Sequence, residues 1–302
     1  MRNFLLCFIL TIGLKQSYGC DMCGCSAGAS QAGLLPYLQH SFIGIRYQQQ
    51  QFKTQGHTTA TEYNTSSTEK FYTGELWGRF VPFRRMQIIG LIPYQLNKQH
   101  QNNSTTSLNG IGDIQFVAIS DILKSPPDNQ KSISYLLQIG MGIKLPSGKS
   151  DYVKDGLMLH QNLQMGTGSI DFPLHLNGLI RHNKLGFQTE AQYRLNGKNK
   201  MHYAFGNQFN GNLKILYWKQ AKKITILPGM GIQLDHRKAD KQQDKPVDHT
   251  GGFGAYWQTS FDIYTKKSGF GVQFSKAIYQ FYGEGLIENK FKLSTYYIYL
   301  IN

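Results

Sequence analysis

The feature that most constrains this sequence is an alternation of apolar and polar side chains that repeats along most of its length. From Leu185 to Leu195, for example, large apolar residues occupy the odd positions and Gly186, Gln188, Glu190, Gln192 and Arg194 the even ones. Successive side chains of a β-strand point to opposite faces, so this pattern predicts strands with one apolar and one polar face. The runs span about 11 to 18 residues, whereas strands of soluble proteins usually have about 5 or 6.

The alternation divides the chain into about twelve expected strands with connections of unequal length. Tight turns are expected at 82–84, 182–184, 218–222 and 266–268, and longer polar stretches at 54–68, 98–109, 146–166 and 238–248. Short turns at one end and long loops at the other are typical of outer-membrane barrels. We therefore predict an all-β fold, a transmembrane antiparallel up-and-down β-barrel of about 12 strands, with both termini in the periplasm. The expected strands are 40–53, 69–82, 84–97, 110–124, 131–145, 167–182, 184–196, 200–218, 222–237, 249–266, 268–280 and 288–301.

The composition agrees with strands rather than helices as the spanning elements. Hydrophobic residues make up 40% of the chain and aromatic residues 13%, yet the mean hydropathy is −0.37. Past the N-terminus there is no apolar run of about 20 residues, which a spanning helix would need. The net charge of +14 could indicate a nucleic-acid partner. Export separates the protein from nucleic acid in the cell, so we expect the basic residues to be solvated in turns or to face lipopolysaccharide phosphates and anionic solutes.

The N-terminus has the pattern of an export signal, which indicates the outer membrane of a Gram-negative bacterium. Arg2 supplies the positive charge, residues 4–14 a short apolar core, and Ser17-Tyr18-Gly19 a small-x-small cleavage site. We expect a signal peptide over 1–19, a Cys-rich periplasmic segment over 20–39 and the barrel over 40–302. Cleavage before Cys20 leaves lipidation of that cysteine as an alternative, although Ser17 stands where lipoprotein signals usually have a leucine-like residue.

A dense group of sulfur ligands follows the cleavage site. Cys20, Met22, Cys23 and Cys25 supply thiolate and thioether groups, which favour Cu(I) or Zn(II). No nearby histidine completes a four-ligand zinc site, so copper is the preferred metal. Three alternatives remain: a disulfide within the segment, a lipidated Cys20 with Cys23 and Cys25 bridged, or no role for these residues.

Charged residues on the polar faces of the strands are the second candidate site. The register places these side chains in the lumen, where they would line a narrow solute pathway with a basic bias that favours anionic or polar solutes. The alternative is that they pair with one another and fill the barrel. The candidates are Arg46, Glu75, Arg79, Lys144, Glu190, Arg194 and Lys214, with His175, Arg181, Asp262 and Lys292 also expected to face inward.

An enzymatic function is the rival class. A barrel hydrolase would need a serine, a histidine and an orienting group on one face near the membrane boundary. His175, His182 and His202 lie near one another in sequence and Ser169 is close. Nothing in the sequence fixes their mutual geometry, and we expect that the protein is not an enzyme.

Three glycine-containing stretches resemble a known family. These are Gly110-Ile111-Gly112-Asp113, the segment from Gly142 to Gly148, and the segment from Gln164 to Asp171. In them the sequence resembles the outer-membrane transporters grouped as the phenol-degradation MetA-pathway family, over roughly 40–302. The resemblance implies an outer-membrane barrel with a transport role and no particular solute. The start of the chain departs from the general pattern and resembles a subset in which Cys-x-x-Cys-x-Cys precedes the first strand. The glycines themselves suit strand starts, bends and bulges in a curved wall.

We therefore expect a channel or transporter for small solutes or ions, metal-linked through the N-terminal cysteines. Its partners would be outer-membrane lipid, lipopolysaccharide, the solute and a periplasmic partner at the N-terminal segment, with no nucleic acid. The alternative is a non-conducting metal-binding or structural barrel.

Overall fold

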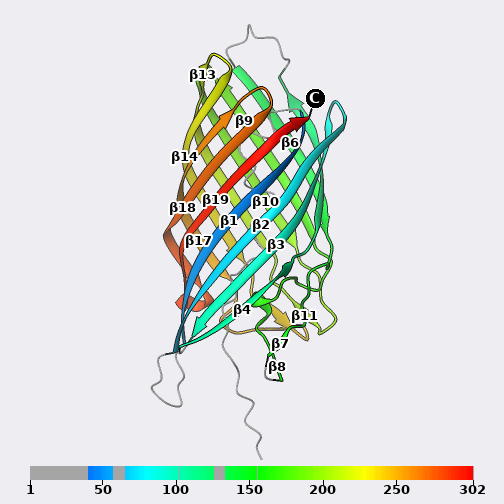
Figure 1. Cartoon of the computed structure of the whole chain (residues 1–302), viewed down its shortest axis with the longest axis vertical. Helices are drawn as coiled ribbons and strands as arrows, with labels where there is room; N and C mark the ends of the chain where they lie inside the picture. Colours follow the sequence, from blue (N-terminus) through cyan, green and yellow to red (C-terminus); the bar gives the residue numbers. More distant parts are fainter. Residues whose placement is uncertain (1–39, 57–64, 102, 126–132, 155, 302) are drawn as a thin grey trace, which may run out of the picture.

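The protein folds into a closed antiparallel β-barrel of twelve wall strands (Figure 1). The computed structural model describes residues 40–56, 65–101, 103–125, 133–154 and 156–301. The expected signal peptide and Cys-rich segment, residues 1–39, lie outside these ranges. Among the described residues, no helix has the length and apolarity needed to cross a membrane.

Each wall strand pairs with its neighbours along the chain. The order runs β12-β10-β9-β6-β5-β3-β2-β1-β19-β18-β17-β14, and the pairing of β12 with β14 closes the ring. Strand β4 (Ser104–Ile111) extends β5 along the same partner, β3. The wall strands are β1 (Ser41–Gly56), β2 (Thr65–Phe83), β3 (Met86–Gln101), β5 (Gln115–Lys124), β6 (Ile133–Lys144), β9 (Phe172–His182), β10 (Leu185–Leu195), β12 (Gln208–Tyr217), β14 (Ile224–Arg237), β17 (Gly252–Tyr264), β18 (Ser268–Tyr282) and β19 (Ile287–Ile301).

The two ends of the barrel differ. We call the end with short hairpins, where Ser41 and Ile301 lie side by side, the turn end, and the opposite end the loop end. Turns of two to three residues join β2 to β3, β9 to β10 and β17 to β18 at the turn end. At the same end β12 continues through β13 (Lys219–Ala221), which forms a tight hairpin with β14. The predicted turns at 82–84, 182–184, 218–222 and 266–268 thus all fall at this end.

The loop end departs from the predicted connections. The stretch 98–109 was expected to be a loop, but β3 and β4 pair from Tyr94–Ile111 to Gln101–Ser104, so the hairpin continues past the wall. The predicted strand 200–218 starts only at Gln208, because Tyr203–Ala204 (β11) pairs with Lys241–Gln242 (β15), which also pairs with Lys245–Pro246 (β16). The link 145–171 carries the hairpin of β7 (Val153–Lys154) and β8 (Leu157–Met158) and the 3-10 turn η1 (Gln161–Leu163); a second such turn, η2 (Gly283–Gly285), joins β18 to β19. The sequence pattern did not predict these pairings because the strands are short, polar and outside the alternation of the wall strands.

The alternation of the sequence becomes an apolar outer face and a polar inner face. Along β10, Leu185 and Phe187 are exposed on the outside, while Gln188, Glu190 and Gln192 are buried inside. An outward apolar band with an inward polar face is the arrangement of barrels that span a membrane. The reason is the solvent: backbone groups are satisfied by strand pairing, so only side chains need to match lipid on one face and the lumen on the other.

Candidate functional site

The middle of the lumen is a layer of charged and amide side chains. Arg46 forms an ion pair with Glu75, and the Gln48 amide donates to the same carboxylate at 3.2 Å. On the opposite wall the Lys214 ammonium donates to Gln273 at 3.1 Å, and Gln273 donates to Gln258 at 3.0 Å. Of these contacts, Lys214–Gln273 joins strands that are not neighbours, β12 and β18, and the others join paired strands.

The seven residues predicted to lie along the solute pathway are all buried, but they lie at three different heights. Arg46, Glu75, Glu190 and Lys214 are in the middle layer; Arg79 is nearer the turn end, and Lys144 and Arg194 nearer the loop end. His175, Asp262 and Lys292 are also buried, whereas Arg181 is half-buried beside the Trp218 ring at the turn end. Their position in the interior matches the predicted register, and their part in a solute pathway stays a prediction.

The interior holds many carboxylates that the sequence did not single out. Among the described residues, buried carboxylates are more numerous than buried cations, so the lumen does not have the basic bias that the sequence suggested. Several are paired, as in Lys292 with Asp235. Even spacing with other inward positions could have found Glu69, Asp121 and Asp235, whereas Asp113, Asp171 and Asp240 lie outside the strands. The additional carboxylates are Glu69, Asp113, Asp121, Asp171, Asp235 and Asp240.

A pair of inward side chains on β9 and β10 has polar atoms with no hydrogen-bond partner among the described residues. His175 and Gln192 stand opposite each other in the strand register and are 4% and 1% exposed. In the part of the chain that the structure describes, the Nε2 of His175 and both polar side-chain atoms of Gln192 have no partner. Buried polar atoms in folded proteins are nearly always hydrogen-bonded, so atoms of this kind mark a place suited to a polar guest.

Apolar side chains line the lumen on both sides of the polar layer. At the turn end a belt that includes Phe42, Trp77 and Leu300 draws on strands around most of the circumference. At the loop end Phe52, Phe71, Tyr256 and Tyr282 pack with Leu163 from the 145–171 link. An apolar constriction resists wetting, so these layers limit the size and hydration of anything that passes.

The three glycine-containing stretches converge on one buried lysine at the loop end. The Lys144 ammonium forms ion pairs with Asp113 and Asp171, the latter at 2.8 Å, and donates to the Thr167 hydroxyl at 2.5 Å. Asp113 also accepts from the backbone N–H groups of Gly148 at 3.0 Å and Thr167 at 2.9 Å. From the sequence, the glycines of these stretches are expected at strand starts, bends and bulges. They also fix the start and the end of the 145–171 link to the wall.

The 145–171 link folds inward from this anchor. Its Leu163 and Met165 are 3% and 2% exposed, and the Asn97 amide on β3 donates to the Leu163 carbonyl at 3.1 Å. The link also reaches the neighbouring loop through His160, whose pKa is lowered to about 4, mainly by burial and further by Arg237, against the opposing effect of Asp240. The sequence predicted this stretch only as a polar loop and missed its buried apolar residues.

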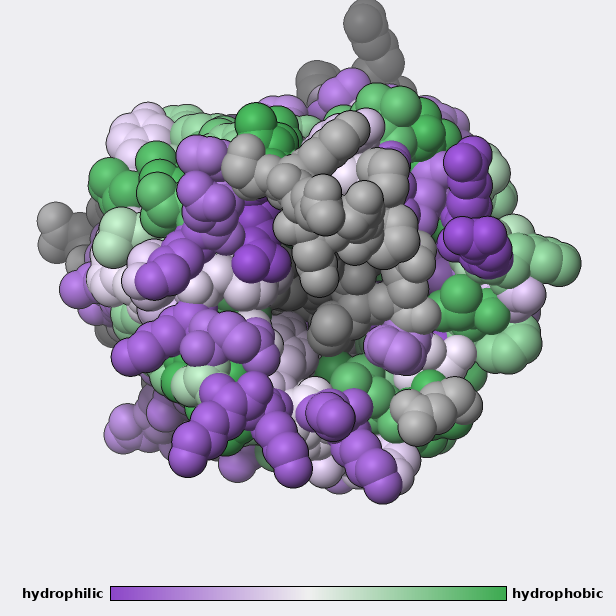
Figure 2. Space-filling view, turned by 90° about the horizontal axis from the view of Figure 1, so that it is seen from above, coloured by the Kyte–Doolittle hydropathy of each residue, from purple (hydrophilic) through white to green (hydrophobic). Residues whose placement is uncertain are grey.

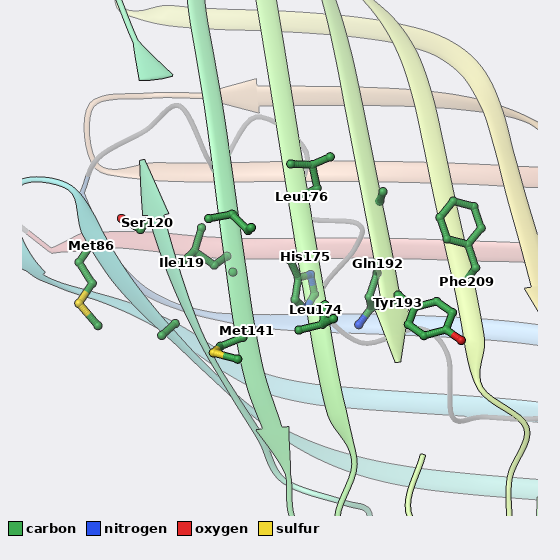
Figure 3. Close-up of a pocket in the computed structure, with 14 residues that line it drawn as sticks. Met86, Ile119, Ser120, Met141, Leu174, His175, Leu176, Gln192, Tyr193 and Phe209 are labelled. Carbon is green, nitrogen blue, oxygen red and sulfur yellow. The ribbon is translucent and has the colours of Figure 1, made fainter. Parts of the chain in front are cut away.

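A groove of about 560 Å³ lies on the outer face of the wall and is lined by residues of β3, β5, β6, β9, β10 and β12 (Figure 3). Met141, Leu174, Leu176 and Phe209 line it and are exposed on the outside of the barrel. Small residues such as Gly140 on β6 leave room between these side chains. Its apolar lining suits lipid chains in a membrane rather than a polar solute.

Other predicted sites are not assembled in the part of the chain that the structure describes. Cys20, Met22, Cys23 and Cys25 lie outside the described residues, and within those residues no group of three His, Cys, Asp or Glu side chains could hold a metal ion. The hydroxyl of Ser169 donates to Asp171 at 2.7 Å at the loop end, whereas His182 is at the other end of β9. These residues do not form a serine–histidine pair.

Comparisons with known proteins were made for the sequence and for the fold. No family model matches the sequence, and no curated protein matches it. Among solved structures, the COG4313 outer membrane channel from Pseudomonas putida F1 matches with a TM-score of 0.62 and 13% identity, over 87% of this chain and 96% of that one. The beta domain of the Bordetella autotransporter BrkA matches with a TM-score of 0.51 and 10% identity, over 87% and 100% of the two chains. At these identities the likeness establishes the fold alone: the chain has the barrel fold of bacterial outer-membrane proteins.

Proposed function

We propose that the protein is a narrow channel in the outer membrane of a Gram-negative bacterium that admits small polar solutes or ions. The observation that carries this proposal is the polar middle layer of the lumen, where His175 and Gln192 have polar atoms that no described residue satisfies. A barrel that served only as a scaffold could fill its interior with apolar residues at lower cost, because unpaired buried polar atoms are destabilising. A shared fold with an outer membrane channel supports the same reading.

The same interior favours a small conductance. Ion pairs such as Arg46–Glu75 occupy the middle of the lumen, the apolar belt lies at the turn end, and the inward 145–171 link lies at the loop end. Passage therefore needs local rearrangement, and motion of the link is the smallest one available. Because buried carboxylates outnumber buried cations among the described residues, we expect a weak preference for cations rather than the anion preference that the sequence suggested.

A second candidate is a non-conducting barrel, favoured by the dense packing of these pairs. Planar bilayers distinguish the two. The mature protein is refolded, its folding is verified by heat-modifiable migration on gels, and current steps are recorded. Discrete steps support the channel. Folded protein that inserts but never conducts contradicts it.

The effect of one lumen substitution on conductance tests the proposal more directly. Gln192→Leu replaces the unpartnered amide with an apolar group of similar size, and Thr189→Val on the same strand is the control, since Thr189 is outside the polar layer. For a channel that uses this position, Gln192→Leu reduces conductance while the control does not. Equal conductance in both variants contradicts a pathway past Gln192.

We also propose a link to metal through the N-terminal segment, in which Cys20, Met22, Cys23 and Cys25 hold Cu(I). The full-length protein is titrated with Cu(I) under reducing conditions against a chromophoric chelator and compared with a variant in which the three cysteines are serine. Loss of tight binding in that variant supports the site. Unchanged binding contradicts it, independently of conduction.

A further inference from the structure

The charges on the two ends of the barrel are distributed very unequally. At the turn end the exposed side chains include many cations, and every exposed carboxylate among the described residues is at the loop end. Several of those carboxylates pair with cations of their own end, as in Lys198–Asp244 at 2.6 Å and Lys290–Glu288 at 2.6 Å. At the turn end the described carboxylate is Asp121, which is 9% exposed. The exposed turn-end cations are Arg84, Arg85, Lys124, Lys184, Lys219, Lys222, Lys223, Lys266 and Lys267.

The densest part of this surface spans two neighbouring hairpins. The β9–β10 turn carries Arg181 and Lys184, and the β12–β14 turn carries Lys219, Lys222 and Lys223. The backbone N–H of Trp218 donates to the Lys184 carbonyl at 2.6 Å, which joins the hairpins. The Arg181 guanidinium lies 4.5 Å from the centre of the Trp218 ring and donates to the Asn183 carbonyl at 2.8 Å. We call these five basic residues the turn-end cluster.

Exposed apolar residues directly adjoin the cations on the outer wall. Leu185 follows Lys184 and is 58% exposed, and Ile224 follows Lys223 and is 41% exposed. The same juxtaposition recurs around the rim, where Phe83 beside Arg84 is 69% exposed. Figure 2 looks onto this end and shows hydrophilic residues around the rim beside hydrophobic ones.

We propose that the turn-end cluster binds the phosphate headgroups of anionic phospholipids in the leaflet at that end. A lipid has an anionic group joined to apolar chains, and the cluster offers cations directly beside lipid-facing apolar residues. A soluble acidic protein would match the charge but would leave the apolar side chains unused. Short turns of such barrels face the periplasm, where the leaflet consists of phospholipid rather than lipopolysaccharide. The inference rests on insertion of the barrel into a membrane and is independent of conduction.

The test is native mass spectrometry of the full chain in detergent, titrated with phosphatidylglycerol or with phosphatidylcholine. In the test variant Arg181, Lys184, Lys219, Lys222 and Lys223 are all changed to glutamine. In the matched control Lys149, Lys200, Lys238, Lys241 and Lys245 at the loop end are changed in the same way. Heat-modifiable migration shows that each variant is folded. Basic residues near an anionic membrane surface each contribute a factor of about five to binding, so the test variant should bind phosphatidylglycerol at least about tenfold more weakly than wild type.

We expect phosphatidylglycerol binding to weaken in the test variant and not in the control. Phosphatidylcholine binding should stay unchanged, and salt should reduce phosphatidylglycerol binding. Equal binding in wild type and test variant overturns the proposal, and so does an equal loss in the control. A third arm uses lipopolysaccharide. A loss in the test variant for lipopolysaccharide but not for phosphatidylglycerol would assign the surface to the other leaflet and overturn the proposal. None of these results depends on whether the barrel conducts.

Discussion

Arg46 on β1 and Glu75 on β2 stand directly opposite each other in the strand register and form an ion pair in the interior of the barrel. The Arg46 guanidinium also lies 5.0 Å from the centre of the Trp77 ring, and Gln48 donates to the same carboxylate. The pair is thus held from both sides, at the boundary between the polar layer and the apolar belt.

Removing one partner of this pair should be strongly destabilising. Glu75→Gln leaves the Arg46 charge buried without its counter-charge, and such losses cost about 3–5 kcal/mol. The free energy of unfolding is measured from urea titrations in lipid vesicles. Glu288→Gln, which removes an exposed partner of Lys290, is the control and should cost less than about 1 kcal/mol. The double variant Arg46→Met with Glu75→Leu should recover most of the loss; if it is no more stable than Glu75→Gln, the charge argument fails.

Lys144→Met should release the 145–171 link without unfolding the barrel. Asp113 and Asp171 would keep their charges with no cation between them, and Thr167 would lose its donor. We expect faster chymotrypsin cleavage within the link, followed by mass spectrometry of the fragments, and heat-modifiable migration that persists. Lys290→Met at the same end is the control. An unchanged cleavage rate would show that Lys144 does not hold the link.

Docking of the link should weaken as the pH falls from about 6.5 toward 4. The pKa of His160 is lowered from 6.5 to about 4 in the folded protein. Between these values the undocked state binds more protons, so protonation favours undocking, and the effect is complete below about 4. A protease that is active at both pH 7 and pH 5 measures the rate of cleavage within the link at each pH. His160→Asn is expected to remove the added sensitivity to cleavage at pH 5. Equal sensitivity in both proteins would refute the role of His160.

Replacement by alanine should lower the free energy of unfolding at one glycine and leave it nearly unchanged at another. A methyl group on Gly206 would collide with the Lys238 carbonyl, at a point where the Gly206 N–H donates to Asp240 at 2.6 Å. Overpacking of this kind costs about 1–3 kcal/mol. A methyl group on Gly74 would meet nothing within 4 Å, and Gly74→Ala should change the free energy of unfolding by less than about 0.5 kcal/mol. Urea titration of both variants gives the comparison, and a smaller loss for Gly206→Ala than for Gly74→Ala would contradict it.

The wall strands could be predicted from the sequence because the face that each side chain occupies depends only on its neighbours in the chain. Alternation between lipid and lumen is visible in each strand, as at Leu185–Leu195, and each of the twelve expected strands overlaps a wall strand. The inward position of Glu75 and Lys214 follows from the same parity. Strand parity depends only on neighbours in sequence, so no tertiary information was needed.

The site could not be predicted to the same extent because its contacts are between distant residues. Lys144 meets Asp113 and Asp171 through the closure of the wall, and nothing in the spacing of these residues requires it. The inward fold of the link likewise depends on a carbonyl at Leu163 that meets Asn97 on β3. Sequence parity therefore predicts which face a residue occupies but not which partner it has there.

The pairing of the first wall strand with the last one has a consequence for assembly. Ser41 is opposite Ile301 and Thr54 is opposite Ile287, so one edge of β1 has no partner until the final residues of the chain are present. An open strand edge invites pairing with other chains. The barrel can therefore close only after β19 has been made. Until then the chain depends on being kept apart from its own copies.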